Sequence, residues 1–242
     1  MQDNQQQAYD RGITIFSPDG RLYQVEYARE AVERGSATVG VRTPSGVVLA
    51  ADRRARSPLI ERDSIEKIHA VDDHVAVASA GHVADARQLV DFARRQAQLD
   101  QLRYDEAIGV ETLTKRVTDH IQQYTQTGGA RPFGVALLVA GVEDGQPRLF
   151  ETDPSGTPYE WQAVAIGGGR DEMQSFLEEE YREDMDLSGG VDLALEALSA
   201  DADVDAAGVN VVTVDVESGS VDTLSDDEVA AHVEELDLGG EE

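Results

Sequence analysis

The sequence predicts an α+β fold in which two antiparallel sheets lie face to face between outer layers of helices, a four-layer α-β-β-α sandwich. Segments of strand character arrive in blocks joined by short turns, and segments of helical period follow each block. Hairpin-linked strands in blocks suit antiparallel sheets better than a doubly wound parallel sheet. The 242 residues, 40% of them hydrophobic, can build one sizeable core, so we expect a single domain over residues 1–242.

The first helix is expected after a polar N-terminal tail, residues 1–12, whose Gln-rich start has no apolar side chains to order it. The motif Pro18-Asp19-Gly20 predicts a turn, because proline fixes φ and glycine accepts a positive φ. Beyond it, apolar residues recur with helical spacing at Leu22, Val25, Ala28 and Val32. Gly35 then stands where a left-handed C-terminal cap would end the helix.

The rest of the chain alternates between the two periods. Strands are expected at 38–42, 46–51, 67–71 and 74–80, and helices at 83–99 and 110–124. Strands return at 135–142, 148–152 and 158–165, with turns at Glu143-Asp144-Gly145 and Asp153-Pro154-Ser155-Gly156. Helices at 172–181 and 191–198, a hairpin of 209–214 with 221–224, and a helix at 226–236 within an acidic end (225–242) complete the chain.

Charge narrows the possible partners. Lys and Arg number 20 and Asp and Glu 48, a net charge of −28, which repels nucleic acids and anionic membranes. Lys67 and Lys115 are the only lysines, and such an acidic, lysine-poor surface resembles proteins adapted to high salt. There are no cysteines, no secretion-signal core and no run long enough to span a membrane. We therefore expect a cytoplasmic protein without disulfides.

Short motifs along nearly the whole chain carry a resemblance. At the N-terminus they are Tyr9-Asp10-Arg11, Phe16-Ser17-Pro18-Asp19-Gly20-Arg21-Leu22 and Gln24-Val25-Glu26-Tyr27-Ala28. Further along they are Gly35-Ser36-Ala37-Thr38-Val39-Gly40, Ala51-Asp52-Arg53-Arg54, Ser64-Ile65-Glu66-Lys67-Ile68, Val83-Ala84-Asp85-Ala86-Arg87, Gln123-Tyr124-Thr125-Gln126, Arg131-Pro132-Phe133-Gly134 and Ala165-Ile166-Gly167. In this order they resemble proteasome α-type subunits, and the acidic composition resembles a haloarchaeal member.

The resemblance implies the N-terminal-nucleophile hydrolase fold and a non-catalytic role. In that family, seven α-type chains form an outer ring that stacks on catalytic β rings of a threonine-type protease. The α ring gates the entry of unfolded protein substrates and receives activator ATPases through their C-terminal tails. No cofactor, metal or catalytic residue is implied for this chain.

The resemblance also assigns residues to three sites. The gate would comprise Tyr9, Asp10, Arg11, Pro18 and Tyr27. A pocket between neighbouring subunits would take the activator tail and comprise Gly20, Glu26, Arg29, Lys67, Gly81 and His82, although an apolar residue is common where His82 stands. A loop narrowing the axial pore would comprise Thr127, Gly128 and Gly129. Lys67 suits a terminal carboxylate as a compact charge, although a surface ion pair with Glu66 or Asp63 is an alternative, as is a plain helix-ending turn at Thr127.

An autoprocessed hydrolase is the main alternative function. Ser36 precedes Thr38-Val39-Gly40 as a nucleophile would, and Asp52 and Lys67 stand roughly where active β subunits keep an acid and a lysine. A working N-terminal nucleophile must be the first residue of the mature chain, however, because its free amine acts as the base. This alternative therefore requires cleavage after Gly35.

A calcium-binding module is a distant third hypothesis. Asp201, Asp203 and Asp205 have the spacing of a calcium loop, but Ala206 and Val212 replace the glycine and the glutamate that the loop needs. The glycines of Ile166-Gly167-Gly168-Gly169-Arg170 lack a phosphate-binding pattern, so we expect a simple connection. The five histidines show no zinc spacing.

Overall fold

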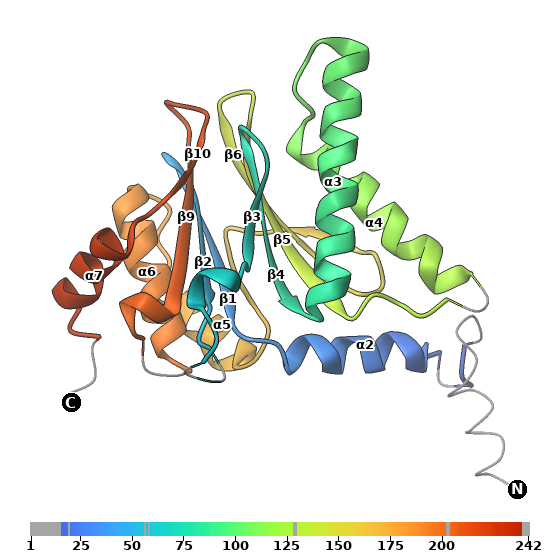
Figure 1. Ribbon diagram of the computed structural model, residues 1–242, viewed down its shortest axis with the longest axis horizontal. Helices are drawn as coiled ribbons and strands as arrows, with labels where there is room; N and C mark the ends of the chain where they lie inside the picture. Colours follow the sequence, from blue (N-terminus) through green and yellow to red (C-terminus); the bar gives the residue numbers. More distant parts are fainter. Residues whose placement is uncertain are drawn as a thin grey trace, which may run out of the picture.

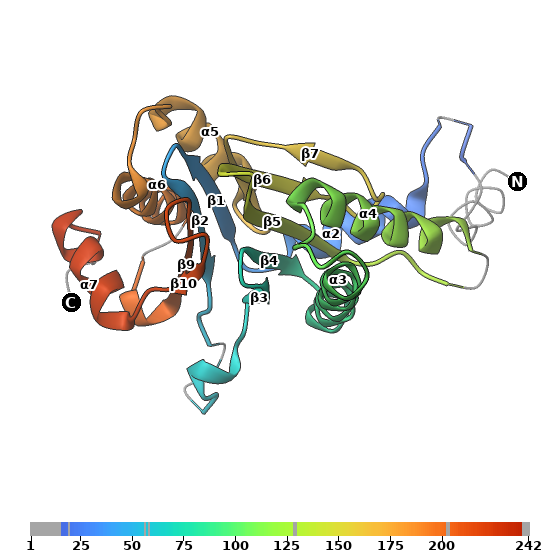
Figure 2. The ribbon, with the colours of Figure 1, turned by 90° about the horizontal axis from the view of Figure 1, so that it is seen from above.

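The structure is a computed structural model. It describes residues 16–18, 20–55, 57, 59–127, 130–201 and 204–238. Two five-stranded sheets lie face to face, with helices on both outer faces (Figure 1). Viewed from above, the layers run from helices through two sheets to helices again (Figure 2). The predicted four-layer sandwich is confirmed.

The first sheet contains β1 (Thr38–Thr43), β2 (Gly46–Asp52), β8 (Ala163–Ile166), β9 (Val209–Asp215) and β10 (Val221–Thr223). Its order is β10-β9-β2-β1-β8, and every neighbouring pair is antiparallel. The second sheet contains β3 (Ile68–Asp72), β4 (Val75–Gly81), β5 (Val135–Glu143), β6 (Gln146–Thr152) and β7 (Pro158–Glu160). Its strands pair antiparallel in chain order.

Helices cover the outer face of each sheet. The second sheet is covered by α3 (Val83–Tyr104) and α4 (Val110–Gln126), and the first by α5 (Arg170–Glu180), α6 (Leu187–Ser199) and α7 (Asp226–Glu235). Two short 3₁₀ turns lie at Arg62–Ser64 and Ala206–Gly208. The remaining helix, α2 (Tyr23–Glu33), runs across one end of the sandwich, along the lower edge of Figure 1.

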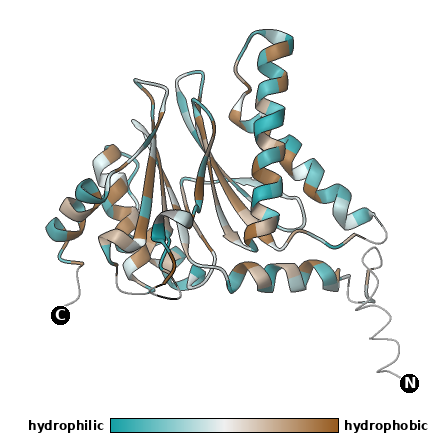
Figure 3. Ribbon diagram, viewed as in Figure 1, coloured by the Kyte–Doolittle hydropathy of each residue, from teal (hydrophilic) through white to brown (hydrophobic). Residues whose placement is uncertain are grey.

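Apolar side chains between the two sheets form the central core. Leu49, Leu138 and Leu149 are fully buried there, each contributing about 1.5–3 kcal/mol to folding. β2 and β5 are buried on both faces, since a sheet covers one face and helices the other. Apolar residues accordingly follow the central strands, whereas the outer helices alternate in hydropathy (Figure 3). Among the described residues, no helix is both long and apolar enough to cross a membrane.

Two predictions about local structure are wrong. The single strand expected at 158–165 is two strands in different sheets: the backbone N–H of Trp161 bonds Leu149 O of the second sheet, while the carbonyl of Gln162 accepts from Arg42 N of the first. The chain therefore crosses between layers at this point. Gly35 is not a left-handed cap, because α2 already ends at Glu33 and Gly35 has no positive φ. Gly35 instead packs directly against the backbone of Gly81.

Candidate docking groove

Part of the predicted gate and pore loop lies outside the described residues, namely Tyr9, Asp10, Arg11, Gly128 and Gly129. Pro18 is exposed in the turn before α2, where Gly20 has the predicted positive φ of 75° and its N–H bonds Ser17 O at 2.8 Å. Tyr27 lies on α2 with 46% of its surface exposed. Thr127 follows α4, and its hydroxyl donates to Gln123 O at 2.7 Å, as in an ordinary helix end.

A groove of about 500 Å³ lies between the C-terminal end of α2, the start of β3 and the junction of β4 with α3. We call it the basic groove. Three of the predicted docking residues, Lys67, Gly81 and His82, line it. Ile60, Ile65 and Val83 add apolar surface, and Ser36 also faces it. The fold thus brings together residues that lie far apart in the sequence.

The floor of the basic groove is formed by backbone segments in close contact, at Gly35, Gly81 and Gly134. A Cβ on Gly35 would lie 2.3 Å from Gly81 N, and a Cβ on Gly81 would lie 2.4 Å from Gly134 O. Gly81 also has a φ of +115°, which side chains disfavour. Glycine is therefore required at Gly81 for both space and backbone conformation.

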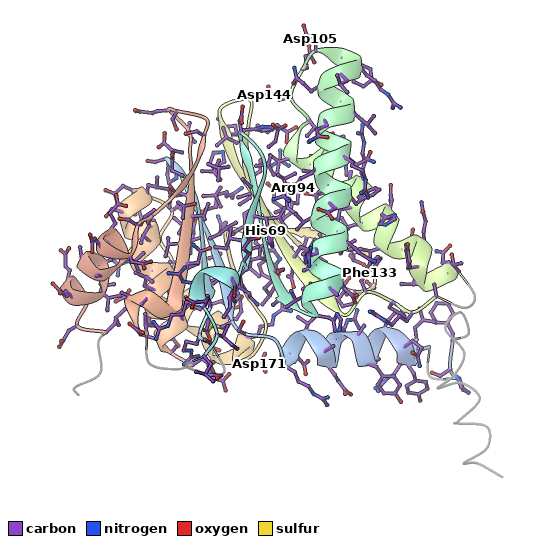
Figure 4. The ribbon with its side chains drawn as sticks, viewed as in Figure 1. His69, Arg94, Asp105, Phe133, Asp144 and Asp171 are labelled. Carbon is purple, nitrogen blue, oxygen red and sulfur yellow. The ribbon has the colours of Figure 1, made fainter. Side chains whose placement is uncertain are left out.

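An ion pair fixes the segment that carries Gly134. Asp85, in the first turn of α3, accepts from both terminal nitrogens of Arg131 at 2.6 and 2.7 Å and from Gly134 N at 2.9 Å. Burial alone would raise the pKa of Asp85, but these bonds outweigh it and lower the pKa. The adjacent Phe133 is buried and packs against Tyr124 of α4, beside the lower end of α3 (Figure 4).

Lys67 is 6% exposed and immediately precedes β3. His82 caps the N-terminus of α3, with its side chain 57% exposed and its Nδ1 3.6 Å from Asp85. All the titratable residues that line the groove are basic: Arg34, Arg54, Lys67 and His82. This lining contrasts with a chain whose net charge is −28. The basic side chains that line this groove favour an anionic ligand.

The other predicted docking residues lie on α2 or just before it. Arg29 donates to Glu26 and to Asp153, both at 2.8 Å, and lines a different cavity of about 410 Å³. Gly20 precedes α2, whereas the groove lies beyond its other end, and a helix of 11 residues is about 16 Å long. Within one chain, the predicted docking set is therefore divided between two places.

We call the second cavity the ion-pair pocket, because four of its five charged lining residues form two ion pairs. Arg170 lies 3.1 Å from Glu151, and Arg29 lies 2.8 Å from Asp153. Burial raises the pKa of Glu151, with Arg170 only partly opposing it. For Asp153 burial acts in the same direction, but hydrogen bonds from Ser155, Arg29 and Thr157 outweigh it and lower the pKa.

Two residues of the alternative functions, Asp52 and Asp205, are engaged in structural contacts. Asp52 holds Arg54 at 2.7 Å, and Asp205 caps the Ala206–Gly208 turn and lies 3.2 Å from Arg62. Part of the suggested calcium loop, Asp203, lies outside the described residues. Among those described, no group of three or more His, Asp or Glu side chains is placed to hold a metal. Gly167 to Gly169 connect β8 to α5, as predicted.

Several groups around the groove cannot be found from sequence patterns. Arg34 and Arg54 come from the ends of α2 and β2, where nothing local marks them as neighbours. The motifs containing Asp85 and Arg131 are recognisable, but nothing in them indicates that the two residues pair. For Asp153, the sequence pattern indicates only a turn.

Comparison with known proteins gives consistent matches over the whole chain. A family model described as "Proteasome subunit" matches residues 32–216, and a second, described as the N-terminal signature of A-type proteasome subunits, matches residues 9–31. The chain is 73% identical to the proteasome alpha 2 subunit of Haloarcula marismortui, covering 100% of both chains. It is 68% identical to the proteasome alpha subunit of Natronomonas pharaonis and 64% identical to that of Halobacterium salinarum, covering 97% of this chain and 93% of each relative.

Proposed function

Because this chain belongs to the proteasome subunit family and carries its α-type N-terminal signature, we propose that it forms the outer seven-membered rings of a 20S proteasome core particle in the cytoplasm. The rings stack on catalytic β rings, admit unfolded proteins through a gate and receive an activator ATPase. Electron microscopy of the purified chain in molar salt tests the ring, and particles without sevenfold symmetry would contradict it.

One observation carries the docking part of this proposal: the lining of the basic groove contains four basic residues and no carboxylate. A protein tail that ends in a free carboxylate offers the complementary charge, and Ile60, Ile65 and Val83 offer apolar contact for its last side chains. Lys67 lines the groove with 6% of its surface exposed, and we propose that its ammonium binds the carboxylate.

The division of the docking set supports a pocket shared by two copies. Gly20, Glu26 and Arg29 do not line the groove of their own chain: Gly20 lies before the far end of α2, and Arg29 is bonded to Glu26 and Asp153 beside a different cavity. They can meet the ligand of Lys67 if a neighbouring subunit presents the outer part of its own α2. A ring supplies such a neighbour at every groove.

Replacing Lys67 tests docking. In particles assembled with β subunits, Lys67→Ala is expected to weaken binding of the activator tail about 10- to 100-fold, because one charged contact is lost. Lys115→Ala is the matched control, since Lys115 is the only other lysine and pairs with Glu111 on the surface of α4. Equal stimulation of peptide hydrolysis by the activator in wild type and Lys67→Ala would refute the docking role.

For the gate, deletion of residues 1–11 is expected to speed peptide entry into assembled particles. The deletion removes Tyr9 and Asp10, whose hydroxyl and carboxylate we propose to bond in the cluster with Pro18 and Tyr27. Hydrolysis of a short fluorogenic peptide measures the rate. A rate equal to that of the intact particle would argue against a gate in this segment.

The non-catalytic assignment is supported by the packing before Ser36. Val25, Ala28 and Val32 of α2 are buried, and Gly35 O accepts from Gly168 N at 2.8 Å. Cleavage after Gly35 would remove all of these contacts. Intact mass decides between the two functions: 26.2 kDa is expected for the uncleaved chain, and a shortened chain beginning at Ser36 would support the autoprocessed hydrolase.

A further inference from the structure

The basic groove has one buried charge, Lys67, and two exposed basic side chains, Arg34 and His82, of which His82 is charged only when protonated. Lys67 lies at the bottom with 6% of its surface exposed. The side chains of Arg34 and His82 are 81% and 57% exposed, and we call these two residues the rim. The groove therefore combines one buried basic side chain with two exposed ones.

The rim charges have weak partners within the chain. Arg34 lies 3.6 Å from Glu30, one turn earlier on the helix, and both side chains are exposed, so this pair contributes little. His82 lies 3.6 Å from Asp85, but that carboxylate already accepts two bonds from Arg131 and one from Gly134. Arg54 differs, because Asp52 holds it at 2.7 and 3.0 Å. The rim is therefore where a ligand's second negative charge would gain most.

From these observations we propose that the groove recognises two negative charges on its ligand. The terminal carboxylate lies at Lys67, and an acidic side chain a few residues earlier lies at the rim formed by Arg34 and His82. This inference rests on the proposed docking function and adds the class of tail that docks. Arg34 and His82 determine the preference for an acidic side chain, whereas Lys67 binds the terminal carboxylate.

The charge of the whole chain makes such recognition selective. With a net charge of −28, most of the surface repels an acidic peptide, so a local basic rim is needed to accept one. The acidic surface elsewhere repels an acidic peptide, whereas the basic rim attracts it. Both effects contribute to specificity for the groove. The effect is largest at low salt, because exposed charges are screened.

Paired peptides test the inference. Short peptides with one apolar residue near a free C-terminal carboxylate carry a single Glu at successive positions before the end, each matched by a Gln twin. Binding to assembled rings is measured by fluorescence anisotropy at the lowest salt that keeps the rings intact. At one position or more, the Glu peptide should bind about two- to fivefold more tightly than its twin, as expected for exposed charge pairs.

Variants assign that preference to the rim. The double variant Arg34→Gln with His82→Gln should abolish the Glu preference, so that each Glu peptide binds this variant no more tightly than its own Gln twin. Arg103→Gln is the control, because Arg103 is exposed in the last turn of α3, at the end opposite His82. It should keep the preference.

The outcomes separate the two proposals. Equal binding of every Glu and Gln pair, or a preference that survives in the double variant, overturns the inference alone. Equal binding of peptides with free and amidated C-termini, or no dependence on Lys67, overturns the docking function and this inference with it.

Discussion

The two sides of α2 hold their charges in opposite ways. In the ion-pair pocket, Arg29 and Arg170 are bound to Asp153 and Glu151 at 2.8 and 3.1 Å. In the basic groove, the lining offers cations without a carboxylate among them, and the rim arginine lies 3.6 Å from an exposed partner. Most charges of the first cavity are therefore paired within its own lining, whereas the lining of the second contains no carboxylate.

This difference teaches how to separate charges that serve the fold from charges that serve binding. Removing a paired, buried charge changes the free energy of unfolding, in a direction set by the balance between the lost ion pair and the relieved cost of burial. An exposed, weakly paired charge affects stability little and is available to a ligand. The same class of substitution should therefore have different consequences on the two sides of the helix.

The largest effect is expected at the groove floor. Gly81→Ala should destabilise the chain by about 2–6 kcal/mol, because its Cβ would lie 2.4 Å from Gly134 O and its φ is +115°. Urea denaturation in molar salt measures the change. Gly219→Ala is the control: its φ of +63° is also positive but nothing lies within 4 Å, so about 1–2 kcal/mol is expected. Equal losses would mean that the floor is not closely packed.

On the other side of α2, Asp153→Asn should cost about 1.5–3 kcal/mol at neutral pH, because an amide cannot accept both the Arg29 bond and the backbone bonds. Since the folded-state pKa of Asp153 is lowered, its contribution is present above the ordinary Asp pKa and is lost as pH falls below it. The variant and wild type should therefore converge in stability on acidification. A constant difference across pH would contradict the assignment.

Glu151→Gln should have the opposite effect on stability at neutral pH. The folded-state pKa of Glu151 is raised by burial, so ionisation disfavours the fold as pH rises through and above the ordinary Glu value. Removing the charge should then stabilise the chain at neutral pH by about 1 kcal/mol, with Arg170 left in contact with solvent. Denaturation at pH 5 and pH 8 measures it, and a loss of stability at pH 8 would show that the ion pair outweighs the burial.

The smallest effect is expected at the rim. Arg34→Ala should change stability by less than about 0.5 kcal/mol, because its pair with Glu30 is long and exposed. Thermal denaturation of this variant beside Asp153→Asn gives the comparison directly. A loss as large as that of Asp153→Asn would remove the distinction between the two sides of α2.

The sequence predicted the layers well because their signals are local. Alternating and helical periods mark most elements within a few residues of their true ends, and the turn at Asp144-Gly145 has the positive φ values that its residues favour. Partner sheets are not a local property. The segment 158–165 has one continuous strand pattern, yet Trp161 bonds one sheet and Gln162 the other.

The candidate site was predictable in part, and through resemblance more than through chemistry. Lys67, Gly81 and His82 were expected together, and the structure brings them to one groove. Arg34 and Arg54 were not expected there, because they line the groove only after core packing has positioned α2 and β2. The close approach of Gly35 to Gly81 also depends on tertiary packing, whereas local sequence predicts a helix cap there.

The glycine floor has a consequence for how this surface can change. Because Gly35 and Gly81 each leave no space for a Cβ, altering either means rebuilding the neighbouring backbone. Arg34 and His82 carry no such constraint. Under the proposed docking function, new pairings between the ring and its activator can therefore be engineered by exchanging outer charges for their opposites on both proteins, with the backbone of the groove floor left intact.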